Sequence, residues 1–170
     1  GAGSLLLEDE ACAVGKPLAK AKFWSRAFDP TASRAGWGTG YAALGSGLAE
    51  KLKAAGIDPD SIDVVVSGAS GARHGDWLEG RTLGQAFGAR VPPVLVPKAV
   101  VGEYGCGGVL AAGVLALAGG TFRRPAGFQE LDPDIGIEPF DGDLPAPRRV
   151  LLSGLGSGGA AAWVILEAVD

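Results

Sequence analysis

The chain has 170 residues, of which 47% are hydrophobic and 20% are charged, a balance that excludes an intrinsically disordered protein. Its formal net charge of −4 argues against a nucleic-acid partner, because binding to a phosphate backbone needs clustered basic residues. No apolar run approaches the roughly 20 residues of a membrane span. Cys12 and Cys106 have neither disulfide nor metal-ligand spacing, which is typical of the reducing cytoplasm. We therefore expect one cytoplasmic domain without metal or cofactor that contacts neither nucleic acid nor membrane.

The start of the chain indicates part of a longer fold. The sequence contains no methionine, and residues 1–8 are typical of the interior of a strand. A processed start methionine before Gly1 is the alternative. We expect a fragment or one half of a larger fold.

The first 40 residues predict two strands and a loop. Residues 4–7 form a short apolar run that predicts a strand, and residues 9–14 predict a single helical turn. Apolar and polar residues alternate over 17–28, which predicts a longer strand with one wet face. Proline and glycine interrupt residues 29–40 and predict a loop, on which we expect Trp37 to pack.

The next segments predict helices that alternate with buried strands. Residues 41–55 carry apolar side chains at helical spacing, and residues 62–66 are a continuous apolar run typical of a buried strand. The small residues 67–72 follow this strand and could cradle an anion through their amides, although they lack the lysine of a phosphate loop. Residues 76–87 predict a helix capped by its first residue, with Glu79 in its first turn.

A lysine and a glutamate lie between the next strand and helix. Residues 93–96 predict a buried strand, and residues 109–117 a helix with almost no polar face. Lys98 follows the strand and Glu103 precedes the helix, where ligands commonly bind at the carboxyl ends of strands in α/β sheets. The alternative is that both are ordinary solvated charges.

The last 50 residues predict an excursion and two strands. Residues 121–147 are rich in proline, glycine and aspartate and predict a long surface segment that covers something. Residues 149–153 and 161–168 predict strands joined by a glycine-rich turn at 154–159. The alternation of strands and helices up to residue 119 predicts βαβ units and a parallel sheet.

The order of the motifs resembles the C-terminal half of the β-ketoacyl synthases, the condensing enzymes of the thiolase fold. The resemblance covers essentially residues 1–170 and implies an α/β fold, half of an αβαβα sandwich with a mixed five-stranded sheet and helices on both faces. It implies that the N-terminal half is absent from this chain, and that the inner helices pack against it. The matching segments are 1–8, 55–63, Gly75-Asp76 with Glu79, Pro97-Lys98 with Gly102, and 156–159.

Two departures from the family pattern bear on function. The resemblance implies a cysteine nucleophile in the missing half and two histidines in this half, but Gly68 and Glu103 occupy the histidine positions. A carboxylate cannot donate to an oxyanion unless it is protonated, and losing one such donor typically costs roughly a hundred- to a thousand-fold in rate. The one histidine, His74, is expected to be solvated.

The resemblance also assigns roles to the remaining site residues. Lys98 and Glu103 are the catalytic candidates, but a structural ion pair of Lys98 with Glu79 or Glu103 is the favoured interpretation, and Asp76 and Glu79 are assigned to such a pair. Ser157 replaces a phenylalanine that gates the pocket of active members. Cys106 is expected to be a small buried residue at a helix start, not a nucleophile. The predicted substrate-binding residues are Ser70, Gly71, Gly156, Ser157 and Gly158.

Three functions follow from the resemblance. The first is a non-catalytic partner subunit, similar to a chain-length factor, that pairs with a ketosynthase in polyketide or fatty-acid biosynthesis and supports docking of an acyl carrier protein. The second is a divergent condensing enzyme or acyltransferase in which a cysteine of the N-terminal half acts with Glu103 as a base. The third is a small-molecule acyl-binding domain. The assembly is expected to be a heterodimer or a homodimer.

Overall fold

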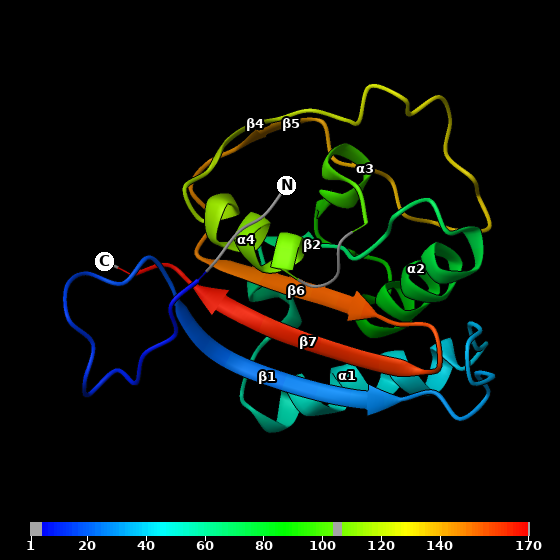
Figure 1. Ribbon diagram of the computed structural model, residues 1–170, viewed down its shortest axis with the longest axis horizontal. Coiled ribbons are helices and arrows are strands. Elements are labelled where there is room, and N and C mark those ends of the chain that lie inside the picture. The colour runs from blue at the N-terminus through cyan, green and yellow to red at the C-terminus, as the bar shows by residue number, and fades with distance from the viewer. Residues whose placement is uncertain (1–4, 104–106, 170) are drawn as a thin grey trace.

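Five strands form the central sheet of the protein. The computed structural model in Figure 1 describes residues 5–103 and 107–169. The strands lie in the order β1-β7-β6-β2-β3. They are β1 (Lys20–Phe28), β2 (Val64–Val66), β3 (Val94–Leu95), β6 (Arg149–Leu155) and β7 (Ala160–Glu167).

The sheet is mixed, as the resemblance predicts. Strand β2 is parallel to β3 and to β6, whereas β7 is antiparallel to β6 and to β1. The parallel arrangement predicted from the alternation of strands and helices therefore holds for β2, β3 and β6 only. Strand β7 returns directly from β6 through a tight turn, and a direct return of this kind makes the pair antiparallel.

Helices cover the two faces of the sheet unequally. Helices α1 (Tyr41–Ala54) and α2 (Arg73–Phe87) pack together on one face, and α4 (Gly107–Ala116) crosses the other face in front of β6 in Figure 1. The short helix α3 (Lys98–Val101) follows β3, and a 3-10 turn spans Pro59–Ser61. Residues of β2 alternate between the two faces, so Val65 packs against α1 and α2 while Val64 and Val66 pack on the side of α4.

One half of the α4 face of the sheet has no cover among the described residues. On β1, Trp24 is 73% exposed and Phe28 is 64% exposed, and both point away from the side of α1. By contrast, Trp163 of β7 points to the α1 side and is 1% exposed. The apolar core is therefore continuous under α1 and α2, whereas on the α4 side it reaches Val164 and Leu166 of β7 but does not include Trp24 or Phe28 of β1.

The segment between α4 and β6 runs over the end of the molecule, as the sequence predicts. Strands β4 (Gly120–Phe122) and β5 (Gly142–Leu144) pair in a separate two-stranded sheet, and residues 123–141 form a loop between them that we call the excursion. The Phe140 N–H donates to the Val94 carbonyl at 2.8 Å, which attaches the returning arm to β3.

Several local predictions are wrong. Residues 5–7 form no strand and are exposed, and residues 9–14 contain a turn stabilised by Asp9 in place of a helical turn. Trp37 packs on α2, where a Cβ added at Gly75 would lie 2.6 Å from its ring, and not on its own loop. In the described part of the chain, no helix is long and apolar enough to cross a membrane.

Candidate functional site

Two carboxylates of α2 hold the loop that follows β2. Glu79 Oε1 accepts a hydrogen bond from the Gly68 N–H at 3.1 Å. Asp76 accepts from the N–H groups of Ser70 and Gly71 at 3.0 and 2.9 Å. Three of the N–H groups in the loop 67–72 that was predicted to cradle an anion therefore already have carboxylate partners, and those of Ser67 and Ala69 donate to the Leu95 carbonyl and to Ser67 Oγ. The two carboxylates at the loop disfavour an anion there.

The position of Asp76 corrects the predicted start of α2. The helix begins at Arg73 with Ala72 as its N-cap, so Asp76 lies in the first turn and Glu79 in the second. Asp76 reaches back to the amides that precede the helix instead of capping it. These donors belong to the loop before the helix and are not the first-turn N–H groups that an N-cap side chain binds.

Glu79 is a buried carboxyl group with few donors. The residue is 2% exposed, and burial raises the pKa of its side chain from 4.5 to about 7. The Ser153 hydroxyl, the Gly68 N–H and the Ser67 hydroxyl act in the opposite direction on this pKa. Ser153 Oγ lies close to the carboxyl group but outside hydrogen-bond geometry, and it is buried without a partner. Near neutral pH the group is therefore about half protonated.

Lys98 pairs with Glu103 and not with Glu79. Lys98 Nζ lies 2.9 Å from Glu103 Oε2, and the two side chains are 10% and 54% exposed. This confirms one of the two predicted partners and excludes the other. Burial raises the pKa of Asp76, and the charge of Lys98 opposes that rise, so the lysine also acts on the α2 carboxylate. Asp76 and Glu79 were assigned to a structural ion pair, but among the described residues neither lies within 4.0 Å of a basic group, and both accept from backbone N–H groups.

The two positions where the family has histidines carry no imidazole. A Cβ at Gly68 would lie 3.1 Å from the Ser153 carbonyl oxygen and 3.6 Å from Glu79 Oε2. Gly68 therefore lies directly over the buried carboxyl group, and Glu103 lies at the exposed end of the Lys98 pair. His74 is on the exposed side of α2, as predicted.

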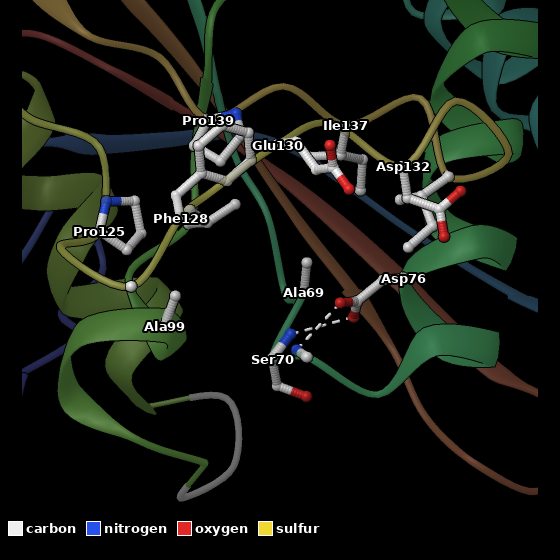
Figure 2. Close-up of a pocket in the computed structure, with 14 residues that line it drawn as sticks. Ala69, Ser70, Asp76, Ala99, Pro125, Phe128, Glu130, Asp132, Ile137 and Pro139 are labelled. Atoms are coloured by element: carbon white, nitrogen blue, oxygen red, sulfur yellow. Dashed lines mark hydrogen bonds between the residues drawn. The ribbon is translucent and has the colours of Figure 1, made fainter.

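A cavity of about 400 Å³ opens beside this loop (Figure 2). Ser70, Gly71 and Asp76 line one wall, and the first two are among the predicted substrate-binding residues. Apolar side chains of the excursion, among them Phe128, form the opposite wall in Figure 2. The excursion thus covers a cavity next to the candidate site, in agreement with the sequence prediction that it covers something.

The glycine-rich turn between β6 and β7 does not line this cavity. Gly156, Ser157 and Gly158 are not among its lining residues, although a Cβ at Gly68 would lie 3.5 Å from the Cα of Gly154, just before the turn. The Gly158 N–H donates to the Gly36 carbonyl at 2.8 Å, and the Gly159 carbonyl accepts from the Asp29 N–H at 2.8 Å. A role of Gly156, Ser157 and Gly158 in substrate binding stays a prediction.

Asp29 is a structural residue that the sequence interpretation missed. Its carboxylate accepts from the Thr31 N–H, the Thr31 hydroxyl and the Gly40 N–H at 2.9, 2.7 and 2.9 Å. Burial acts to raise the pKa of Asp29, but these hydrogen bonds outweigh it and hold the pKa below its usual value. The Asp-x-Thr sequence was the one local signal for such a turn. Cys106 lies outside the described residues.

No family model matches the chain. Among curated proteins, it is 30% identical to the Streptomyces coelicolor protein named as beta-ketoacyl synthase 2 of the actinorhodin polyketide, over 98% of this chain and 42% of that one. It is also 30% identical to 3-oxoacyl-acyl-carrier-protein synthase 2 of Mycobacterium bovis, over 86% of this chain and 34% of the relative. The chain spans less than half the length of these relatives.

The chain is related to the C-terminal part of the β-ketoacyl synthases. Solved structures show the same fold. The ishigamide ketosynthase/chain length factor superposes with a TM-score of 0.76 at 20% identity, over 90% of this chain and 38% of that one. A type II PKS acyl-carrier protein in complex with its ketosynthase gives 0.77 at 17% identity, over 90% and 39%. The half of the thiolase-like fold predicted from the motifs is thereby confirmed.

Proposed function

We propose that this β-ketoacyl synthase homologue is a non-catalytic partner subunit, similar to a chain-length factor, of a ketosynthase in polyketide or fatty-acid biosynthesis. The observation that carries the proposal is the pair of residues at the family's histidine positions. Gly68 offers no side chain, and Glu103 is engaged by Lys98 at 2.9 Å. Neither residue supplies the hydrogen-bond donor that condensation requires.

The charges around the site support the same conclusion. Decarboxylative condensation develops negative charge on an enolate and on a thioester oxygen, and active members of the family neutralise it with donors. Here, Glu103 and Asp76 are the acidic groups that face Lys98, and Glu79 is a third acidic group behind the loop. A site with three carboxyl groups and one lysine raises the energy of a nearby oxyanion.

The names of the similar proteins support a partner role. One solved structure is of a ketosynthase with its chain length factor, and another holds an acyl carrier protein against its ketosynthase. We infer that a ketosynthase and an acyl carrier protein are the partners of this chain, and that the N-terminal half of its own fold covers the open half of the sheet at Trp24 and Phe28. Burying two aromatic side chains of this size is a large favourable contribution to such an interface.

The test is acylation of the purified assembly that contains this chain and its ketosynthase. The assembly is incubated with an acyl-carrier-protein thioester and then with a malonyl donor, and intact-protein mass spectrometry locates the acyl adduct. We expect the adduct on the ketosynthase subunit and none on the polypeptide with this chain. The Glu103→Gln variant should extend chains at the same rate, as should Glu50→Gln, a surface control on α1.

The same experiment separates the divergent-enzyme alternative, in which Glu103 acts as a base. An adduct on the subunit that contains this chain, together with extension that Glu103→Gln abolishes and Glu50→Gln does not, would contradict the partner role. The exposed carboxylate of Glu103, at 54%, is the observation that keeps this alternative worth testing.

A further inference from the structure

Two cavities meet beneath the excursion. The first has about 400 Å³ and the second about 210 Å³, and Val96, Pro125 and Pro139 line both of them. Because the two cavities share three lining residues, they lie next to each other, between the excursion and helices α3 and α4. Volumes of this size are those of small-molecule sites in proteins.

The far end and one wall of this space are apolar. Phe128 and Ile137 line the first cavity, and Leu115, Phe122 and Phe140 line the second. Leu115 is 70% exposed although it belongs to a helix with almost no polar residue. The second cavity therefore offers apolar surface that a hydrocarbon chain would remove from water.

The near end of the space is acidic. Asp76, Glu130 and Asp132 line the first cavity, and Figure 2 labels all three among the lining side chains. Asp132 is bound by Arg73 at 3.1 Å, so its charge is compensated. Within the described ranges, neither Asp76 nor Glu130 forms an ion pair within 4.0 Å.

Most of the basic residues around the cavities are already paired. Lys98 binds Glu103 at 2.9 Å, Arg124 binds Glu138 at 2.6 Å, and Arg123, which lines the second cavity, binds Asp141 at 3.1 Å. Asp76 is half-buried, and burial raises its pKa. The end of the cavity at Asp76 thus favours a positive group and disfavours a carboxylate or a phosphate.

The walls are held by close contacts, so the space is formed before a ligand arrives. A Cβ at Gly80 would lie 2.0 Å from the Ile135 carbonyl oxygen, which places the excursion directly on α2. Arg73 also binds Asp134 at 3.3 Å, and the Phe140 N–H binds Val94. A preformed space reduces the ordering cost of binding.

We propose that the joined cavities bind an amphiphile with a cationic head and an apolar tail. The ammonium group contacts Asp76, and the tail passes Phe128 and Val96 into the second cavity. The free oxygen lone pairs of Asp76 accept from the ammonium while its bonds to the Ser70 and Gly71 N–H groups remain. This proposal does not rest on the partner role proposed above, because it uses neither Gly68 nor Glu103, although Asp76 enters both arguments.

The test compares three probes with one tail: octylammonium, 1-octanol and octanoate. Isothermal titration of the purified protein, in the assembly in which it is expressed, gives the affinity of each. We expect saturable binding of octylammonium at least tenfold tighter than that of octanoate, with octanol between them. Equal affinities for the three probes, or no saturable binding, would overturn the proposal.

Variants locate the probe. Asp76→Asn should reduce the preference of ammonium over octanol to less than threefold, and Ala99→Trp, which fills the mouth of the first cavity, should abolish binding of all three probes. Ala99 is exposed and leaves the core untouched, so this variant decides the matter if Asp76→Asn does not fold. Glu50→Gln, a surface carboxylate on α1 outside the lining, is the control and should leave all affinities unchanged. Unaltered binding in Ala99→Trp would place the probe elsewhere.

Discussion

Two buried carboxyl groups, Asp29 and Glu79, have pKa values that shift in opposite directions. Asp29 is 1% exposed and Glu79 is 2% exposed, but Glu79 lies deeper in the protein, so burial raises its pKa far more. Asp29 accepts three hydrogen bonds from Thr31 and Gly40, and its pKa falls. Glu79 accepts one bond within 3.5 Å from an N–H group, and its pKa rises to about 7. The depth of burial and the hydrogen bonds together decide which charge state each site stabilises.

The difference has a structural cause. Around Asp29, glycines bring the chain so close that a Cβ at Gly38 or Gly40 would lie 2.0 or 2.3 Å from a carboxylate oxygen. Around Glu79, the neighbouring groups are two serine hydroxyls and a single glycine amide. The first region is a charged anchor for the loop 29–40, and the second is a carboxyl group that the fold keeps partly protonated.

Removing the charged anchor should have the largest effect. Asp29→Ala leaves the N–H groups of Thr31 and Gly40 without their acceptor, and we expect a loss of about 3 kcal/mol in the free energy of unfolding. Because the folded pKa of Asp29 is lowered, its contribution is present above the unfolded pKa and is lost as pH falls through the folded pKa. Urea unfolding at pH 7 and at pH 3 measures both effects. A loss below 1 kcal/mol at pH 7 would contradict the anchor role.

Neutralising Glu79 should have the opposite effect and increase the free energy of unfolding. The folded pKa of Glu79 is raised, so its contribution is fully present below the unfolded pKa of about 4.5 and is lost as pH rises through about 7. Glu79→Gln should therefore stabilise the fold by about 2 kcal/mol at pH 8 and flatten the pH dependence between 4.5 and 7. Thermal unfolding across that pH range is the measurement. If Glu79→Gln leaves the pH dependence of stability between 4.5 and 7 unchanged, Glu79 does not cause that dependence.

Adding a methyl group at Gly68 should have a smaller effect on the free energy of unfolding. Gly68→Ala places a methyl group 3.1 Å from the Ser153 carbonyl oxygen, tighter than an ordinary contact, and should cost up to about 1 kcal/mol. Gly47→Ala is the matched control on α1, because its Cβ would meet nothing within 4 Å. The control should gain about 0.5 to 1 kcal/mol from helix propensity. Equal effects of the two substitutions would contradict close packing at Gly68.

The ion pair of Lys98 with the half-exposed Glu103 should contribute least to the free energy of unfolding. Glu103→Gln keeps the size of the side chain and removes its charge opposite Lys98, and the 54% exposure of Glu103 limits the value of the pair. We expect a loss of about 0.5 kcal/mol or less at low salt and none at 1 M salt. Chemical unfolding at both salt concentrations checks this. A loss above 2 kcal/mol would show a pair that is buried in the assembly.

The regular parts of the fold were predictable because their information is local. The alternation over residues 17–28 matches β1, and the helical spacing over 41–55 matches α1 within one residue. The resemblance then supplied the mixed sheet, which periodicity alone predicted to be parallel. Local pattern failed at residues 5–7, whose apolar side chains find no strand partner in the described part of the chain.

The candidate site was only partly predictable because its contacts are between distant residues. Lys98 and Glu103 are five residues apart, and their pairing was among the predicted alternatives. The hydrogen bond of Asp29 to Gly40 and the contact of Gly80 with Ile135 join segments that no spacing rule connects. The position of Gly156, Ser157 and Gly158 outside the cavity lining likewise depends on the packing of the turn against residues 29–36.

The open half of the sheet makes Trp24 a natural optical probe. Its indole is 73% exposed, whereas that of Trp163 on the neighbouring strand is 1% exposed. The first should emit at long wavelength and be quenched by iodide, and the second should do neither. If another polypeptide covers β1, the emission of Trp24 shifts to shorter wavelength. Assembly can then be followed in a cuvette without a label.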